Sequence, residues 1–345
     1  MKNRYLAAAF GALGILILIL DSETALRGAS EGVTICIQTL IPSLFPFFVL
    51  SSVVTASCSG MTLPFLSAAG KLCHIPKGAE SLLAVGILGG YPVGAQCVAQ
   101  ACSQEIISRK DAGKMIVFCN NAGPSFIFGI VASQFSDPHI GWLIWGVQIC
   151  SAVIAGMLLS TESSQSTGVY KSTMPSMTQI MERAMRAIAA VCGWVILFRM
   201  ALSFLDRWIL WALPGEIRIC AAAILELANG CLLLGNVENE GLRFVLSCAF
   251  LSFGGLCVTM QTASVANGIS LRHYLPGKLI QTMLCVILSM WAQYLLPDLL
   301  RFPVSLTFLV IVSLLTAGTI LCLRIRKKRC SNPEPVVVYL SRYHR

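Results

Sequence analysis

The 345-residue chain carries too few charged residues to form a water-soluble globule. Only 12% of its residues are charged and 56% are hydrophobic, whereas soluble domains carry roughly 25% charged residues. Its mean hydropathy is +0.76. The net charge of +9 would suit a nucleic-acid-binding protein, but the basic residues lie between apolar runs and at the two ends, as the positive-inside bias of membrane proteins produces. We therefore expect an integral membrane protein that contacts the lipid bilayer and binds no nucleic acid.

The apolar segments predict an all-α polytopic protein. A spanning helix needs about 20 apolar residues. Full spans are predicted at 5–20, 33–55, 113–135, 140–159, 187–205, 219–235, 278–297 and 304–323. The first segment follows two basic residues and also fits a signal peptide, but many spans follow it, so we interpret it as a retained helix. The 15 cysteines lie mostly inside apolar runs, where cysteine packs as a small hydrophobe.

Two further apolar stretches, 80–101 and 242–268, contain adjacent glycines near their middles. The residues that break them are Gly89, Gly90, Pro92 and Gly94 in the first and Gly254 and Gly255 in the second. Glycine lacks conformational restraint and proline lacks an amide donor, and backbone freed inside a membrane must be satisfied by protein or water. The pattern predicts two re-entrant hairpins, each made of two short helices joined by a glycine-rich tip. A kinked full span is the competing interpretation.

Basic residues bear on the hairpin interpretation. They flank the first stretch on both sides, with Lys71 and Lys77 before it and Arg109, Lys110 and Lys114 after it. Both flanks are cytoplasmic under the positive-inside rule, which a hairpin permits and a single span does not. With Arg272 and Lys278 also counted as cytoplasmic, eight spans plus two hairpins place all these basic residues on the same side of the membrane. We expect a cell-membrane protein with both termini in the cytoplasm.

The glycine pairs also predict an internal repeat. A valine and a glutamine follow each pair at the same offsets, as Val93 and Gln96 in one unit and Val258 and Gln261 in the other. The predicted regions are an N-terminal helix and loop (1–32), a first membrane repeat (33–159), a polar linker with a surface helix (160–186), a second membrane repeat (187–323) and a basic cytoplasmic tail (324–345). The charge count makes the repeats parallel. Inverted repeats are the commoner transporter plan, and this point stays open.

A second kind of interruption lies in the middle of the predicted span 113–135. Asn120 and Asn121 are adjacent there, and amide side chains at membrane depth are costly unless they have partners. They are followed by Gly123, Pro124 and Ser125. The proline removes a backbone hydrogen bond and frees a carbonyl one turn earlier. Amides, open carbonyls and a half-helix N-terminus make a pocket for a small ion, whereas the alternative is a kink packed by asparagine hydrogen bonds.

The two predicted hairpin tips offer further candidates for solute contact. The first presents the ring of Tyr91 and the amide of Gln96, and the second presents Thr259 and Gln261. If both tips meet at the middle of the membrane, they frame one cavity with the asparagine pair. The alternative role of the glycines is helix packing through small residues.

Two ionisable residues, Arg199 and Glu226, lie inside apolar runs. A charge at bilayer depth costs about 3 kcal/mol or more on insertion scales, so it is usually paired or functional. Either the two residues pair with each other, or Arg199 binds a substrate carboxylate while Glu226 carries a coupling proton or sodium ion. Asn229, one turn after Glu226, completes the predicted substrate-binding set. The sequence contains no catalytic, phosphate-binding or metal-binding motif, and we predict neither an enzyme nor a cofactor.

Four blocks of the sequence together resemble a known family. They are the segments 41–48, 90–95, 119–124 and 226–230. They resemble the YlbJ-type sporulation integral membrane proteins, which belong to the nucleoside-recognition, or Gate-domain, group. The resemblance runs over 33–300 and implies a fold similar to that of concentrative nucleoside transporters. The chain carries Gly89 and Ala228 where the group has serine or threonine, which leaves the substrate more open than the fold.

The resemblance implies a role in endospore formation, in the outer forespore membrane. Members are associated with cortex formation and with moving dipicolinate, a small planar dianion, from the mother cell toward the forespore. We therefore expect a secondary transporter of a small carboxylate, with dipicolinate as the first candidate. The alternatives are a proton- or sodium-coupled transporter of nucleoside-like solutes and a membrane scaffold for spore assembly that transports nothing. A homo-oligomer is compatible with each.

Overall fold

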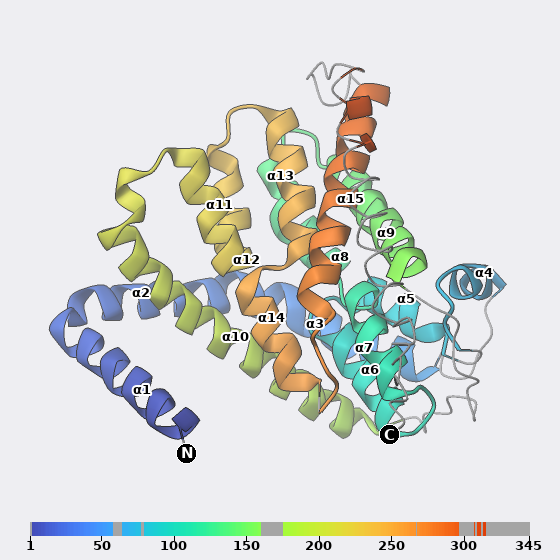
Figure 1. Cartoon of the computed structure of the whole chain (residues 1–345), viewed down its shortest axis with the longest axis horizontal. Helices are drawn as coiled ribbons and strands as arrows, with labels where there is room; N and C mark the ends of the chain where they lie inside the picture. Colours follow the sequence, from blue (N-terminus) through green and yellow to red (C-terminus); the bar gives the residue numbers. More distant parts are fainter. Residues whose placement is uncertain are drawn as a thin grey trace, which may run out of the picture.

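The structure is a computed structural model that describes residues 2–57, 64–76, 79–159, 175–266, 268–296 and part of 307–314. Every regular element within these residues is a helix, in agreement with the predicted all-α class (Figure 1). Five helices in the described ranges are long and apolar enough to cross a membrane, namely Ser22–Leu50, Ile140–Leu159, Met177–Trp208, Glu240–Val265 and Tyr274–Leu295. They are fewer than the eight predicted spans because the segments 113–135 and 219–235 are broken into shorter helices and the segment 304–323 lies largely outside the described residues.

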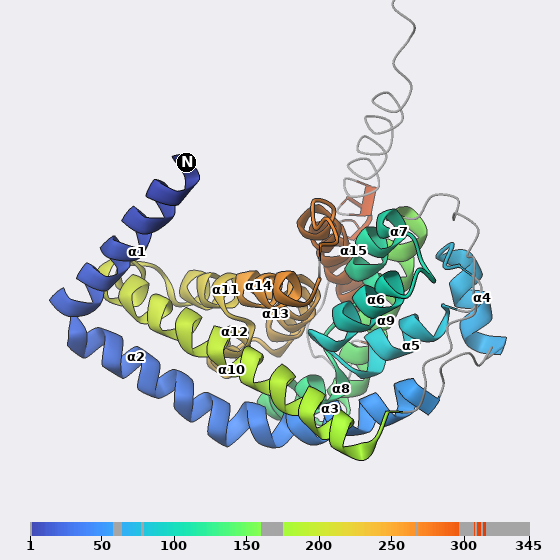
Figure 2. The same ribbon diagram turned by 90° about the horizontal axis from the view of Figure 1, so that it is seen from below.

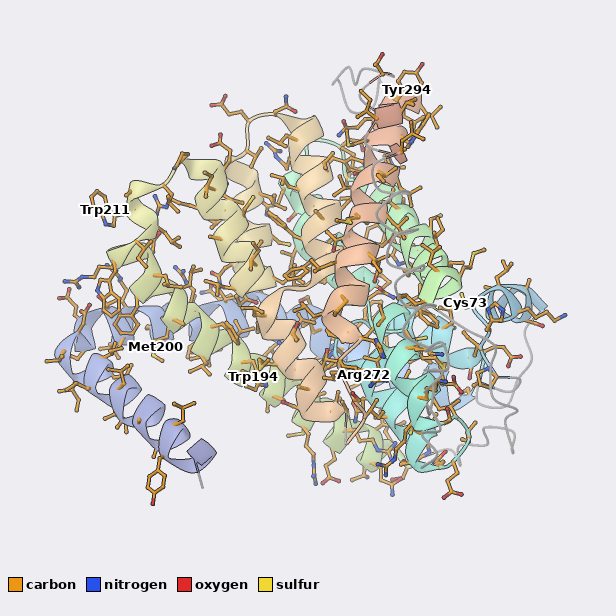
Figure 3. The ribbon with its side chains drawn as sticks, viewed as in Figure 1. Cys73, Trp194, Met200, Trp211, Arg272 and Tyr294 are labelled. Carbon is orange, nitrogen blue, oxygen red and sulfur yellow. The ribbon has the colours of Figure 1, made fainter. Side chains whose placement is uncertain are left out.

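Two long helices run side by side along one face of the molecule (Figure 2). After α1 (Lys2–Leu20), they are α2 (Ser22–Ile35), which continues through a π-helical turn (Cys36–Leu40) into α3 (Ile41–Ser57), and α10 (Met177–Trp208). Small residues let their backbones approach, since a Cβ at Gly32 would lie 2.9 Å from the Ile196 Cα. Trp194 of α10 also donates to the Ser264 hydroxyl (3.3 Å), which ties α10 to α14 (Figure 3).

A first group of shorter elements follows α3. In chain order they are α4 (Pro64–Leu72), α5 (Ser81–Leu88), α6 (Val93–Ser103), α7 (Arg109–Phe118), α8 (Pro124–Phe126) with its helical continuation to Gln134, and α9 (Ile140–Leu159). α5 and α6 pack against each other across the turn 89–92. A Cβ would lie 2.1 Å from the Cys119 carbonyl oxygen at Gly86 and 1.8 Å from it at Gly94. The first glycine-rich stretch is therefore a pair of short helices that close around the end of α7.

A second group of elements follows α10. It consists of α11 (Gly215–Leu225), α12 (Leu227–Leu233), α13 (Glu240–Phe253), α14 (Gly255–Val265) and α15 (Tyr274–Leu295). α12 folds back along α11, since a Cβ at Gly230 would lie 2.3 Å from the Ala223 Cα. α13 and α14 instead follow one another in the same direction (Figure 1), with Gly254 between them at φ +80°. α15 then returns beside α13 and α9.

Two predictions are wrong in this second group. The segment 219–235, predicted as a full span, is a hairpin, because the extended residue Glu226 ends one helix and begins the next. The stretch 242–268, predicted as a re-entrant hairpin, is a bent helix from Glu240 to Val265. Its two left-handed glycines bend the helix axis without reversing it.

The order of elements nevertheless recurs along the chain. Two folded-back short helices, a broken helix and a long helix occur as α5–α6, α7–α8 and α9, and again as α11–α12, α13–α14 and α15. In this order the first glycine pair corresponds to the Glu226 tip and not to Gly254-Gly255. The repeat predicted from the valine and glutamine offsets therefore pairs a turn between two helices (89–92) with a bend within a helix (Gly254-Gly255).

Several predicted regions lie wholly or largely outside the described residues. They are the polar linker, the span 304–323 and the basic tail 324–345. The surface helix predicted after the linker is the first part of α10, which runs on into the predicted span 187–205 without a break. Ser176 caps it by accepting from the Gln179 amide (3.3 Å).

The tight contact of α6 with the end of α7 predicts a marked cost for an added methyl group. Gly94→Ala should lower the free energy of unfolding by about 1–3 kcal/mol, the usual cost of overpacking, because the Cys119 carbonyl cannot move freely. Gly146→Ala in α9, where a Cβ would meet nothing within 4 Å, should leave stability unchanged or slightly higher. Thermal unfolding of the two purified variants measures both effects, and equal midpoints would contradict the contact.

Candidate functional site

Four interruptions of helical structure meet at the centre of the molecule. They are the turn between α5 and α6, the break between α7 and α8, the tip between α11 and α12 and the bend between α13 and α14. Gly90 lies against Gly123, since a Cβ at Gly90 would be 2.9 Å from the Gly123 amide nitrogen. Gly255 lies against the end of α11, where a Cβ would be 2.8 Å from the Ala223 carbonyl oxygen. Each folded-back helix pair thus closes on one broken helix.

A small cavity of about 40 Å³ lies between these interruptions. A buried water needs roughly 10–15 Å³, so the cavity has room for a few waters and must widen to hold a larger solute. Polar side chains reach it from several elements, namely Tyr91, Ser125, Glu226 and Gln261. The glycines Gly89, Gly90 and Gly123 also line the wall, and apolar side chains of the π-helical turn 36–40, α3, α8, α10, α12 and α14 close the remainder. Glu226 is the only carboxylate among these lining residues.

Glu226 forms the tip between α11 and α12 and is 2% exposed. Its backbone is extended (φ −142°, ψ 115°), which ends α11. Its carboxylate accepts hydrogen bonds from the backbone amides of Ala228 (3.0 Å) and Asn229 (2.7 Å) and from the Asn229 side chain (2.8 Å). A carboxylate at a helix N-terminus is stabilised by the free amides and by the helix dipole. The charge of Glu226 is therefore held by neutral donors.

The asparagine pair joins the break after α7 to three other elements. The Asn120 side-chain amide donates to the hydroxyls of Thr262 in α14 (2.9 Å) and Tyr274 in α15 (3.2 Å). Its side-chain oxygen accepts from the Ala95 amide of α6 (3.3 Å). Neither Asn120 nor Asn121 lines the cavity in this conformation. The pair holds the broken backbone in shape directly beside the cavity.

Lys278 is a buried charge that sequence reasoning placed on the cytoplasmic surface, and that prediction is wrong. Its side chain is 0% exposed. The ammonium donates to the Asn120 carbonyl oxygen (2.5 Å), Gln281 Oε1 (3.0 Å) and Asn121 Oδ1 (3.3 Å). The sequence does hold a signal for this burial, a polar stripe on α15 at spacings of three or four residues, which places it on one helix face. The stripe comprises Tyr274, Lys278, Gln281, Cys285, Ser289 and Gln293, all of them buried.

Tyr91 links the first helix pair to the second broken helix. Its hydroxyl donates to the Leu251 carbonyl oxygen (2.6 Å). Leu251 lies in the last turn of α13, where carbonyls have no partner within the helix. The ring of Tyr91 also lies 5.4 Å from the Lys278 ammonium. Tyr91 therefore satisfies a helix end and lines the cavity at the same time.

The electrostatic character of the cavity depends on which of the surrounding helix ends already have a hydrogen-bonding or charged partner within the protein. α6, α8, α12 and α14 all begin at the four interruptions, and helix N-termini carry partial positive charge that favours anions. Of the carbonyl ends that meet there, that of α7 accepts from Lys278 and that of α13 accepts from Tyr91. Positive helix ends therefore border the cavity beside the C-terminal ends of α5 and α11, and the Glu226 carboxylate occupies the N-terminus of α12.

Arg199 and Glu226 do not pair with each other, in contrast to one of the two predictions for them. The Arg199 guanidinium forms a salt bridge with Glu31 of α2, because α10 packs along α2 at this level. Arg199, Glu31 and Asn229 line an open groove beside the cavity. Asn229 also donates to the Glu226 carboxylate, so one hydrogen bond joins a residue of the groove to a residue of the cavity wall.

Two further predicted site residues, Gln96 and Thr259, line neither the cavity nor the groove. Gln96 is on α6 outside the cavity wall, and Thr259 donates to the Gly255 carbonyl of its own helix (3.0 Å). Gln261, in contrast, lines the cavity, and its amide donates to the Cys257 sulfur (3.3 Å). Among the described residues, His, Cys, Asp and Glu form no group of three or more that could hold a metal ion.

Comparison with known proteins finds a relative in a sporulating bacterium. Over 163 residues, which are 46% of this chain, the sequence is 27% identical to the sporulation integral membrane protein YlbJ of Bacillus subtilis (strain 168). The chain is a relative of the YlbJ-type proteins. This confirms the predicted resemblance, while the Gate-domain assignment stays a prediction. The match spans 39% of the relative's own length, and neither a family model nor a solved structure matches the chain.

The contact between Tyr91 and α13 predicts a measurable loss of stability when its hydroxyl is removed. Tyr91→Phe should lower the free energy of unfolding by about 1–3 kcal/mol, because the Leu251 carbonyl is left buried without a donor. Tyr294→Phe, at an exposed position on α15, is the matched control and should unfold like the unaltered protein. A Tyr91→Phe variant as stable as the control would show that the hydroxyl contact contributes nothing.

Proposed function

We propose that this chain is a secondary transporter of a small carboxylate. The solute binds between the tip of the α5–α6 pair and the tip of the α11–α12 pair. The observation that carries the proposal is the convergence of four helix interruptions on one buried cavity. Backbone without regular hydrogen bonding is tolerated at membrane depth where it lines a cavity or is sheltered by protein. Discontinuous helices around a central site are the usual construction of transporter binding sites.

The charge pattern favours an anionic solute. The N-termini of α6 and α8 border the cavity, and no carboxylate among the described residues bonds to them, whereas Glu226 occupies the N-terminus of α12. Lys278 adds a positive charge behind Tyr91. A solute carboxylate bound at α6 or α8 therefore meets backbone amides and positive helix ends. Arg199 and Arg27 line the groove through which the solute approaches, together with Glu23 and Glu31, and Arg199 pairs with Glu31.

Glu226 is the residue we assign to coupling. Its carboxylate both lines the cavity and accepts from Asn229, which lines the groove. A proton on this carboxylate weakens its hydrogen bonds to α12, because charge-assisted bonds are roughly twice as strong as neutral ones. Protonation thus loosens the contact that joins the cavity wall to the groove. Binding of a proton and opening of the path are in this way linked at one side chain.

The arrangement of the two groups of elements supports inverted halves, not the parallel halves expected from the charge count. α7 and α8 run in the opposite direction to α13 and α14 (Figure 1). The end of the molecule where α7 begins also carries the loop with Arg272 and the start of α1 (Figure 3). Basic loops mark the cytoplasmic side, so we assign this end to the cytoplasm. The C-terminal tail lies outside the described residues.

Dipicolinate is the first solute to test, because the chain is related to a sporulation membrane protein. Dipicolinate is a planar dianion, and both of its carboxylates can be matched by half-helix N-termini. The corresponding location is the outer forespore membrane. A nucleoside-like solute has no carboxylate and would gain little from the positive helix ends.

The proposal predicts carboxylate release from liposomes that contain the purified full chain. Liposomes loaded with dipicolinate should release it, as followed by the luminescence of terbium added outside, and a proton gradient should change the rate. Glu226→Gln should slow release at least about tenfold, a change equivalent to about 1.4 kcal/mol, because an amide carries no transferable proton. Liposomes loaded with labelled uridine should retain it.

Glu216→Gln is the matched control, since Glu216 is an exposed residue in the first turn of the same helix pair. It should release dipicolinate at the unaltered rate. Release of neither solute above protein-free liposomes would contradict transport and favour a membrane scaffold. Equal release of uridine and dipicolinate would contradict the preference for a carboxylate.

A further inference from the structure

Lys278 carries a buried positive charge that has no acidic partner. Among the described residues, no carboxylate oxygen lies within 4.0 Å of its ammonium, and none of the salt bridges in this part of the chain includes Lys278. An unpaired buried charge is strongly destabilising unless hydrogen bonds replace the lost water. The residues around Lys278 must therefore supply a complete set of acceptors.

The break between α7 and α8 explains the main acceptor. In a continuous helix the Asn120 carbonyl would accept from the residue four positions later. That residue is Pro124, which has no amide hydrogen. The carbonyl is thus left open at the negative end of α7, and the Lys278 ammonium donates to it at 2.5 Å. The broken helix α7–α8 supplies the acceptor and α15, far away in the chain, supplies the donor.

The remaining ligands of the ammonium are also neutral oxygens. Gln281 Oε1 lies at 3.0 Å and Asn121 Oδ1 at 3.3 Å, and the rings of Tyr91 and Tyr274 flank it at 5.4 and 5.9 Å from their centroids. One backbone carbonyl and two amide oxygens at a broken helix are the kind of ligand set with which transporters coordinate sodium. In this chain the ligand set is occupied by a charge of the chain itself.

We propose that Lys278 is a tethered cation: its ammonium occupies a position that would otherwise bind a sodium or potassium ion, so solute binding requires neither. The consequence for solute binding rests on the proposed transport function, whereas the occupied cation position does not. The side chain stays with the protein through every step. It links α15 to the break between α7 and α8, and it cannot cross the membrane with the solute as a free coupling ion would. Coupling is then left to the proton on Glu226.

The test is the thermal unfolding of the purified full chain in sodium, potassium and choline chloride at equal concentrations. The unaltered protein should unfold at the same temperature in all three salts. Lys278→Ala should unfold at a lower temperature in choline chloride and recover several degrees in sodium or potassium chloride. The free ion then binds the vacated oxygens and stabilises the folded state by mass action.

Lys114→Ala is the matched control, because Lys114 is a buried lysine on α7 whose ammonium lies 4.0 Å from Asp111. It should respond equally to the three salts. A Lys278→Ala variant that unfolds at the same temperature in every salt would overturn the proposal. If that variant does not fold, the unaltered protein decides, since stabilisation by sodium or potassium over choline would show an open ion site.

The transport assay separates this inference from the proposed function. Dipicolinate release should run at the same rate in sodium and choline chloride, and a requirement for sodium would overturn the tethered cation. If no dipicolinate is released in any salt, the proposed function fails. The unfolding temperatures then still decide whether Lys278 fills a cation position.

Discussion

Backbone hydrogen bonding inside a bilayer is the constraint on which this structure depends. Each amide and carbonyl at a helix end must find a partner within the protein, because the surrounding lipid offers none. Four helix interruptions meet at one point here, and the chain supplies partners from distant segments. Lys278 and Tyr91 donate to open carbonyls, and Glu226 accepts from open amides. The positions of the functional side chains follow from these pairings.

The pairings also divide the charges at the centre into two kinds. Lys278 is buried among neutral oxygens and does not line the cavity, so its ammonium belongs to the packing of the fold. Glu226 lies at the cavity wall and holds the contact with Asn229 beside an open groove, so its charge can change with a proton. A tethered ammonium, positive helix ends and one exchangeable carboxylate together suit a proton-coupled carrier of carboxylates.

Sequence patterns predicted the helical membrane class and the breaks at 89–94 and 119–125, because glycine, proline and asparagine in apolar runs leave a local signal. They failed where one residue type serves two geometries. Gly254 bends a helix whereas Gly89 and Gly90 form a turn, and the chain direction after each depends on what packs against it. Lys278 was misplaced because its main acceptor, Asn120, lies 158 residues away. The roles of the site residues in binding remain predictions.

The accessibility of the interrupted backbone to water is the central claim, and hydrogen–deuterium exchange of the full chain in lipid nanodiscs tests it most directly. Amides in the segments 90–91 and 121–123 and at Gly255 should exchange faster than those in the middle of α9, which is a continuous helix. Protection of these segments equal to that of α9 would mean that water does not reach the centre, and the proposed path for a solute would be contradicted.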